Sequence, residues 1–238
     1  MNGCDYMYNQ FKYLIAGDKA VIVEVGESID EKINRVIISL EKEINDSFND
    51  ELLEVIPTYR SIMIQYNPIK ITYMELLNKL KSIENNLKVT ENKTNKVIVI
   101  PVVYGGEYGS DIGNVAEYNN LSIKDVIKIH SSTKYLIYML GFTAGFPYLG
   151  GLDKRIHTPR LERPRIKIEA GSIGIANNQT GIYPVDSPGG WQIIGKTPLK
   201  LFNQNSENPF LLEPGKYIRF KPISKRRFLQ LKIEEEGA

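Results

Sequence analysis

The density of glycine and proline in the C-terminal half is the feature that most constrains the fold of this chain. Residues 141–195 hold 10 of the 19 glycines in the sequence. From Tyr135 onward, short apolar runs alternate with glycine and proline, and no segment repeats apolar residues at helical spacing. Glycines this frequent cost chain entropy, so they indicate tight turns or close approach of the backbone to itself or to a ligand. The pattern predicts a closed or nearly closed β structure, with no helix after Tyr135.

The N-terminal part has a different periodicity. Four apolar segments are typical of strands: residues 11–15, 20–25, 52–56 and 61–66. Apolar residues recur at helical spacing after Asp30 and again after Thr72, which forms a capping box with Glu75. The order strand-strand-helix-strand-strand-helix predicts a small α+β domain over residues 1–90, in which two helices cover a four-stranded antiparallel sheet.

A second domain is predicted over residues 91–238. Residues 91–96 are polar and without period, as in a linker, and the apolar run 97–103 follows as the first strand of the new domain. Two short helices are expected over residues 111–119 and from Ser122 to about Ile129, before the turn-rich part begins. The second domain is therefore expected to be mainly β.

Composition excludes several classes of protein. The 238 residues carry a formal net charge of +2, with 42% hydrophobic and 24% charged residues, as in ordinary globular chains. Cys4 is the single cysteine, so no internal disulfide can form. Basic residues are not concentrated as in a nucleic-acid-binding face, and no apolar run approaches 18 residues. We expect a cytoplasmic protein with neither a nucleic acid nor a membrane as partner.

No strong catalytic motif stands out. The sequence lacks a phosphate-binding loop of the Gly-x4-Gly-Lys-Ser/Thr type and a Gly-x-Gly-x-x-Gly fingerprint. With two histidines and one cysteine, no metal site is predicted. What remains is a set of glycine-rich turns interleaved with polar residues. Exposed amide groups in such turns can hold an anion, but a small barrel with sharp corners also needs glycines for its geometry.

Single residues leave alternatives open. His130 ends a short helix, so it is either a charge that complements the helix dipole or a general base. The basic stretch over residues 154–167, with Arg160 and Arg163, is either a solvated face or a site for a phosphate or carboxylate. Trp191, the only tryptophan, fills a core or forms a stacking wall for a planar ligand.

These considerations give a candidate site. The predicted catalytic residues are His130, Arg160 and Gln179. The predicted substrate-binding residues are Pro147, Tyr148, Arg163, Thr180, Gly181, Tyr183, Ser187, Gly189, Gly190 and Trp191.

Four segments closely resemble the family of 5-oxoprolinase B subunits, also called KipI-like or allophanate hydrolase subunit 1. They are residues 139–152 (MLGFTAGFPYLGGL), 157–160 (HTPR), 170–176 (AGSIGIA) and 179–195 (QTGIYPVDSPGGWQIIG). The sequence departs from the family pattern at Ala144 and Glu169, where proline is common, and at Asn177, where glycine is common. Asn177 can still hold a positive φ, whereas Glu169 adds a carboxylate beside the candidate site.

The resemblance implies a fold and a function. After the α+β domain it implies a cyclophilin-like β-barrel. It also implies a partner, the C subunit of 5-oxoprolinase, and joint hydrolysis of 5-oxoproline to glutamate with the A subunit, using ATP and Mg. This chain would then be inactive alone and would share the nucleotide with the C subunit. The same resemblance allows two alternatives: a KipI-type inhibitor of histidine kinase autophosphorylation, and half of an amide or urea carboxyltransferase.

Overall fold

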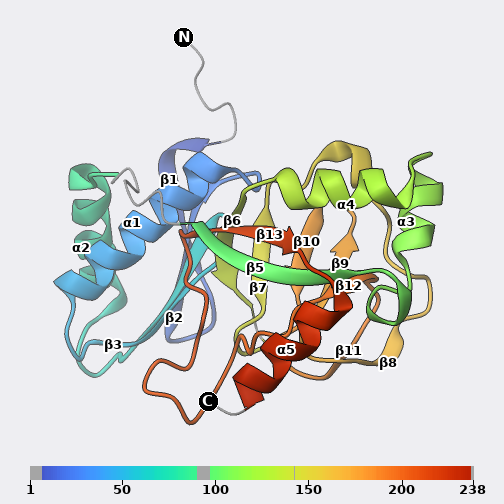
Figure 1. Ribbon diagram of the computed structural model, residues 1–238. Helices are drawn as coiled ribbons and strands as arrows, with labels where there is room; N and C mark the ends of the chain where they lie inside the picture. The colour runs from blue at the N-terminus through green and yellow to red at the C-terminus, as the bar shows by residue number, and fades with distance from the viewer. Residues whose placement is uncertain (1–6, 90–96, 142, 237–238) are drawn as a thin grey trace. The chain divides into compact units, whose positions relative to one another are not determined.

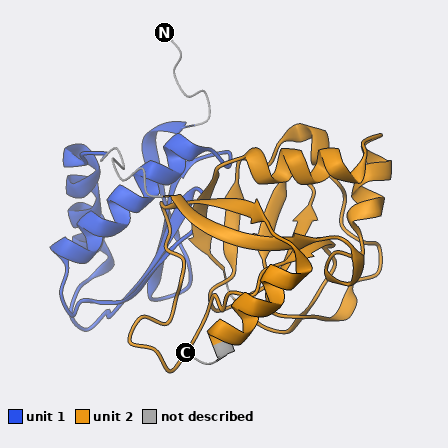
Figure 2. Cartoon of the chain, viewed as in Figure 1, with its two compact units in different colours: residues 1–93 blue, residues 94–238 orange. Residues whose placement is uncertain are grey.

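The structure, a computed structural model, describes residues 7–89, 97–141 and 143–236. The chain divides into two compact units, residues 1–93 and 94–238 (Figure 2). Cys4 and the predicted linker over residues 91–96 lie outside the described residues. None of the described helices combines the length and apolar character that a membrane span requires.

The first unit has the predicted α+β architecture (Figure 1). Its elements are β1 (Met7–Ile15), β2 (Ala20–Gly26), α1 (Glu31–Ser47), β3 (Leu52–Pro57), β4 (Ser61–Tyr66) and α2 (Tyr73–Asn86). The four strands form one antiparallel sheet in the order β1-β2-β4-β3. Both helices and the sheet contribute to a single apolar core, so the alternation and the helical periodicity are satisfied together.

Helix ends in this unit follow from local chemistry. The Asp30 side chain accepts hydrogen bonds from the backbone N–H groups of Lys32 and Ile33 at the start of α1. At the start of α2, Thr72 and Glu75 each bond the other's backbone N–H, which confirms the predicted capping box.

The second unit is a closed seven-stranded barrel, which confirms the mainly-β prediction. Its strands are β5 (Val97–Tyr104), β6 (Tyr135–Leu140), β7 (Pro147–Gly150), β9 (Ser172–Ala176), β10 (Gln179–Ile182), β12 (Gln192–Lys196) and β13 (Tyr217–Pro222). The order around the barrel is β10-β7-β6-β13-β5-β12-β9, with β5 and β13 parallel. Asn177 closes the turn between β9 and β10 at φ 53°, the conformation expected of an asparagine in a glycine position.

Short helices surround the barrel. They are η1 (Gly106–Tyr108), α3 (Ile112–Tyr118), α4 (Ile123–Ser132) and η2 (Lys154–Ile156). Helix α3 packs beside α4 and on β12, and α4 packs on β13. The predicted helices over residues 111–119 and 122–129 are thus present, with the second running three residues further.

The prediction that no helix follows Tyr135 is wrong. Helix α5 (Lys225–Glu236) ends the described chain (Figure 1). Its sequence, KRRFLQLKIEEE, has no continuous apolar stripe, so periodicity could not reveal it. One side chain anchors it: Phe228 is buried, with its ring 4.8 Å from that of Tyr108. An ion pair of 2.5 Å between Lys225 and Glu107 adds a second contact.

A two-stranded ribbon lies outside the barrel. It pairs β8 (Arg165–Ile168) antiparallel with β11 (Ser187–Gly189). Because β11 is followed directly by Gly190, Trp191 and β12, this ribbon joins the turn-rich motif 179–195 to the barrel wall. We call it the β8–β11 ribbon.

Candidate functional site

A cavity of about 330 Å³ opens beside the β8–β11 ribbon, and we call it the β11 cavity. Its lining residues are Thr143, Phe146, Tyr148, Arg160, Tyr183, Ser187, Pro188, Gly189, Gly190 and Trp191. They come from the two longest glycine-rich motifs and from the HTPR segment, which are far apart in sequence. A volume of this size lies at the lower end of the range of small-molecule sites.

Aromatic rings form the floor of the β11 cavity. Phe146 meets Tyr183 and Trp191 edge to face, with ring centroids 5.3 and 5.5 Å apart. Tyr183 and Trp191 are themselves edge to face at 6.3 Å, and Tyr148 lies 5.0 Å from Phe146. The floor rests on Ile168 and Ile193 in one buried cluster, so the rings are fixed before a ligand arrives.

Aromatic rings lie against two glycines of this region and leave no room for a Cβ atom. A Cβ on Gly181 would lie 3.0 Å from Trp191 and 3.1 Å from Phe146. A Cβ on Gly189 would lie 2.4 Å from the Tyr183 hydroxyl oxygen. Glycine is therefore needed at these two positions because a larger residue would collide with the aromatic rings. Neither position needs glycine for a sharp corner of the barrel.

One cation lines the β11 cavity. Arg160 is exposed and has no ion-pair or hydrogen-bond partner among the described residues. Burial raises the pKa of Tyr148, and the nearby charge of Arg160 opposes that shift. Burial also raises the pKa of Tyr183 to about 12, so both phenols are neutral at physiological pH. The cavity thus offers one guanidinium beside a neutral aromatic floor, and Ser187 also belongs to its lining.

The structure brings together seven of the thirteen predicted site residues. They are Tyr148, Arg160, Tyr183, Ser187, Gly189, Gly190 and Trp191. Of the others, Gly181 lies beneath the floor, as described above, and Pro147 is buried between two lining residues. Gln179 and Arg163 do not line the cavity, although Arg163 is only three residues from Arg160.

Three lining residues were missed: Thr143, Phe146 and Pro188. All three lie inside the glycine-rich motifs that pointed to the site, so the signal was present. An isolated phenylalanine such as Phe146 is more often a core residue than a ligand contact. Here it is both, since the ring is buried in the cluster and still reaches the cavity.

His130 does not reach the β11 cavity. It is 0% exposed, and its ring stacks on Phe220 with centroids 4.5 Å apart. Its Nδ1 lies 2.8 Å from the Tyr104 hydroxyl oxygen, and its Nε2 lies 3.0 Å from Thr180 Oγ1. Since Thr180 donates its own proton to the Gly174 carbonyl oxygen, it accepts from Nε2–H, and Nδ1 accepts from Tyr104.

The role of His130 as a catalytic base is therefore corrected to a structural one. Both ring nitrogens already have partners, and burial lowers the pKa of the imidazole from 6.5 to about 3. A neutral, fully bonded ring inside the barrel neither caps the helix as a cation nor takes a proton from a ligand. Thr180, predicted to bind substrate, is buried with it in the same chain of hydrogen bonds.

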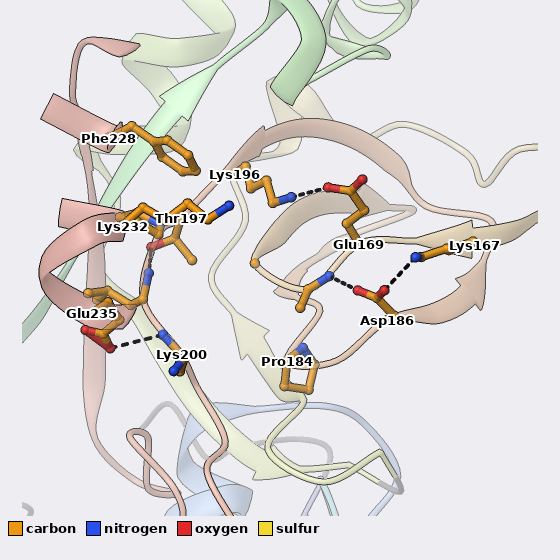
Figure 3. Close-up of a pocket in the computed structure, with 14 residues that line it drawn as sticks. Lys167, Glu169, Pro184, Asp186, Lys196, Thr197, Lys200, Phe228, Lys232 and Glu235 are labelled. Carbon is orange, nitrogen blue, oxygen red and sulfur yellow. Dashed lines mark hydrogen bonds and ion pairs between the residues drawn. The ribbon is translucent and has the colours of Figure 1, made fainter. Parts of the chain in front are cut away.

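A second cavity, of about 340 Å³, lies between α5 and the turns that precede β9 and follow β12 (Figure 3). We call it the α5 cavity. It is lined by Pro184, Phe228 and several charged side chains, among them Lys196 and Glu169.

Most charged side chains around the α5 cavity form ion pairs or hydrogen bonds with one another. Lys196 pairs with Glu169, and Lys167 pairs with Asp186 at 2.8 Å (Figure 3). Asp186 also accepts from the backbone N–H of Ala170. The β11 cavity, with its unpaired arginine, is therefore the better candidate for a charged ligand. Among the described residues, no group of three or more His, Cys, Asp or Glu side chains could hold a metal ion.

Solved structures of other proteins share this fold. The chain is similar to the K. lactis urea amidolyase, with a TM-score of 0.79, 22% identity, and coverage of 95% of this chain and 16% of that one. It is also similar to the protein TTHA0988, with a TM-score of 0.78, 32% identity, and coverage of 87% of this chain. This chain spans 40% of the TTHA0988 chain, so the same fold also occurs as part of longer chains.

Sequence comparison supplies the family. Residues 11–212 match the carboxyltransferase domain, subdomain C and D. The 5-oxoprolinase B subunit of Bacillus subtilis (strain 168) is 38% identical over 232 residues, which are 92% of this chain and 95% of that protein. The chain therefore belongs to the carboxyltransferase subdomain C and D family and groups within it with the 5-oxoprolinase B subunits, which confirms the resemblance seen in its motifs.

Proposed function

We propose that this chain is the B subunit of an ATP-dependent 5-oxoprolinase, which converts 5-oxoproline to glutamate together with the C and A subunits. The observation that carries the proposal is the pairing, in one cavity, of an aromatic floor with the partner-free Arg160. 5-Oxoproline is a small, nearly planar lactam with one carboxylate. Its ring suits the floor made by Phe146 and Trp191, and its carboxylate suits a guanidinium.

The share of this chain in the reaction is binding and orientation. A lactam carbonyl is stabilised by resonance and is a poor electrophile. ATP, when bound, would supply the phosphoryl group that turns the lactam oxygen into a leaving group. Arg160 would fix the carboxylate end of the ring, and the floor would hold its plane. The Ser187 hydroxyl, in the lining of the cavity, would donate to a lactam oxygen as charge develops there.

ATP itself does not fit the β11 cavity. A triphosphate needs several cations or amide donors, whereas Arg160 is the single cation among the described residues of the lining. We propose that the nucleotide, with Mg, is bound in a site completed by the C subunit, and that the chain is inactive without its partners. We also propose that the barrel is of the cyclophilin-like type that the family resemblance implies, with residues 1–90 and 91–238 as separate domains.

The alternatives draw less support. The urea amidolyase of Lachancea kluyveri is 28% identical over 248 residues, but these are only 13% of that protein. The similarity to the 5-oxoprolinase B subunit is higher, at 38%, and extends over almost the whole of both chains. A role as a histidine kinase inhibitor would need a docking surface rather than a cavity with an arginine, so the lactam function is preferred.

The test is a matched pair of arginine variants. Arg160→Ala, in the chain purified together with its own C and A subunits, should raise the KM for 5-oxoproline about tenfold, because a charge-assisted hydrogen bond of ~1.5 kcal/mol is lost. Arg163→Ala is the control, since Arg163 is also exposed but does not line the cavity. ATP-dependent glutamate formation is the measurement. Equal KM values for both variants and the wild type would remove Arg160 from substrate binding.

A further inference from the structure

The β8–β11 ribbon forms one wall of the β11 cavity but is poorly supported by its own pairing. It supplies Ser187, Pro188 and Gly189 to the lining. Its ladder consists of Ser187 opposite Ile168 and Gly189 opposite Arg165, with a register shift between them. Neither strand joins the barrel sheet. A two-stranded ribbon this short is not stable by itself, so other contacts must hold it in place.

An open cavity borders β8 of the ribbon. A third cavity, of about 410 Å³, is lined by Arg165 and Ile168 from β8 and by Ser172 and Ile193 from the barrel strands. Ile168 is itself buried in the aromatic cluster, whereas Arg165, at the other end of β8, borders this open space. The placement of that end of the ribbon therefore depends on the polar contacts of Arg165.

An ion pair fixes Arg165 beside this cavity. Arg165 Nη2 lies 2.6 Å from Asp111 Oδ1, and the Asp111 side chain is only 5% exposed. Asp111 is in turn fixed to β12: its Oδ2 accepts from the Ile193 N–H at 2.7 Å, and its own N–H donates to the Ile193 carbonyl oxygen at 2.8 Å. The ladder between β12 and β9 shifts register between Ile193 and Gly195, so the carboxylate fills a bulge. Asp111 is thus fixed to the barrel strand β12, and through the ion pair it holds Arg165 of the ribbon.

The other ion pairs of this region are more exposed. Lys167 and Asp186, with side chains 65% and 50% exposed, link the ribbon to itself. Glu169 and Lys196 connect the end of the ribbon to β12, but the Glu169 side chain is 67% exposed. Exposed pairs contribute little because water screens them. Of these ion pairs, only the one between Asp111 and Arg165 has an almost fully buried carboxylate.

We infer that Asp111 and Arg165 are positioning residues that set the distance between the β8–β11 ribbon and the aromatic floor, and so the width of the β11 cavity. Neither side chain lines that cavity, so they act through Ser187, Gly189 and Trp191 rather than on the ligand. The inference rests on the proposed function only for the identity of the ligand, 5-oxoproline. The position of the ribbon can be measured without it.

The sole tryptophan gives a direct readout. Trp191 is 5% exposed, lies in the floor and follows the ribbon by two residues. In Arg165→Met and Asp111→Asn, acrylamide should quench its fluorescence about twofold more strongly, because a displaced ribbon uncovers the indole. With the C and A subunits present, KM for 5-oxoproline should rise about tenfold with kcat within about twofold, as expected when ground-state and transition-state binding are lost together. Arg165→Lys should recover part of both effects, since it keeps the charge.

Lys167→Met is the matched control, since it removes a cation of the same strand whose ion pair is exposed. It should leave quenching and KM at wild-type values. Wild-type quenching and KM in Arg165→Met and Asp111→Asn would overturn the inference. So would loss of the folded circular dichroism signal in Arg165→Met at 25 °C, because the pair would then hold the whole barrel rather than the ribbon.

The two proposals can fail separately. If 5-oxoproline does not bind the wild-type complex while quenching rises in the Arg165 and Asp111 variants, the ligand is wrong and the positioning pair stands. If 5-oxoproline binds and Arg160→Ala weakens it, but quenching and KM are unchanged in the pair variants, the ligand stands and the positioning pair is wrong.

Discussion

The buried state of His130 predicts a specific loss of stability in mild acid. In the folded chain the imidazole stays neutral, because burial lowers its pKa from 6.5 to about 3. In the unfolded chain the imidazole is solvated and takes up a proton as the pH falls below 6.5. Between pH 6.5 and pH 3 the unfolded state therefore binds one more proton than the folded state, and stability falls with decreasing pH. Above pH 6.5 this contribution is fully present.

The magnitude follows from linkage. Protonation of an unfolded imidazole with a pKa of 6.5 favours unfolding by about 1.4 kcal/mol at pH 5.5 and by less than about 0.1 kcal/mol at pH 7.5. Moving from pH 7.5 to 5.5 should therefore cost the wild type about 1.4 kcal/mol through His130 alone. The other histidine, His157, is only partly buried and is present in both proteins compared below, so its contribution cancels.

The assay is urea unfolding of the wild type and His130→Gln at pH 7.5 and 5.5. Glutamine can still bond Thr180 but has no proton to gain, so the loss between the two pH values should be smaller in the variant by about 1.4 kcal/mol. The variant will be less stable at both pH values, which does not affect this difference. An equal pH dependence in both proteins would refute the reasoning, because it would mean that His130 takes up protons in the folded barrel and is open to solvent.

Three further substitutions test local features. Gly109→Ala should lower the free energy of unfolding by at least about 3 kcal/mol in urea, because its Cβ would lie 2.2 Å from the Ile194 carbonyl oxygen and neither backbone can retreat. Gly189→Ala should cost about 1–3 kcal/mol and weaken 5-oxoproline binding in calorimetry, because its Cβ would push on the Tyr183 hydroxyl under the floor. Thr72→Ala should cost about 1 kcal/mol, through loss of the α2 cap, and leave binding unchanged. A Gly109 variant as stable as the wild type, a Gly189 variant that binds normally, or a Thr72 variant that binds poorly would each count against the structure.

Much of the fold could be predicted because local patterns and tertiary packing agree. In the first unit, strand alternation and the apolar stripes of α1 and α2 bury into the same core, so periodicity alone identified every element. In the second unit, the density of glycine and proline correctly predicted a turn-rich β structure. Helix α5 escaped because a single buried side chain, Phe228, anchors it, and one residue makes no period.

The sequence motifs located the candidate site, but they did not predict the role of each residue in it. Arg160 and Arg163 were both predicted site residues, and only the path of the chain toward β8 places one of them beside the cavity. His130 was ambiguous for the same reason: a histidine at the end of a helix is exposed or buried according to what packs against it. Here Phe220 and Tyr104, from two different strands, enclose it, and that arrangement depends on the closure of the barrel.

The most direct measurement is a crystal structure of the wild-type chain with 5-oxoproline, alone or with the C and A subunits. The lactam ring should lie on Phe146 and Trp191 in the β11 cavity, with its carboxylate about 3 Å from the Arg160 guanidinium. A ligand bound instead in the α5 cavity, or bound in the β11 cavity with its carboxylate away from Arg160, would contradict the function proposed for this chain.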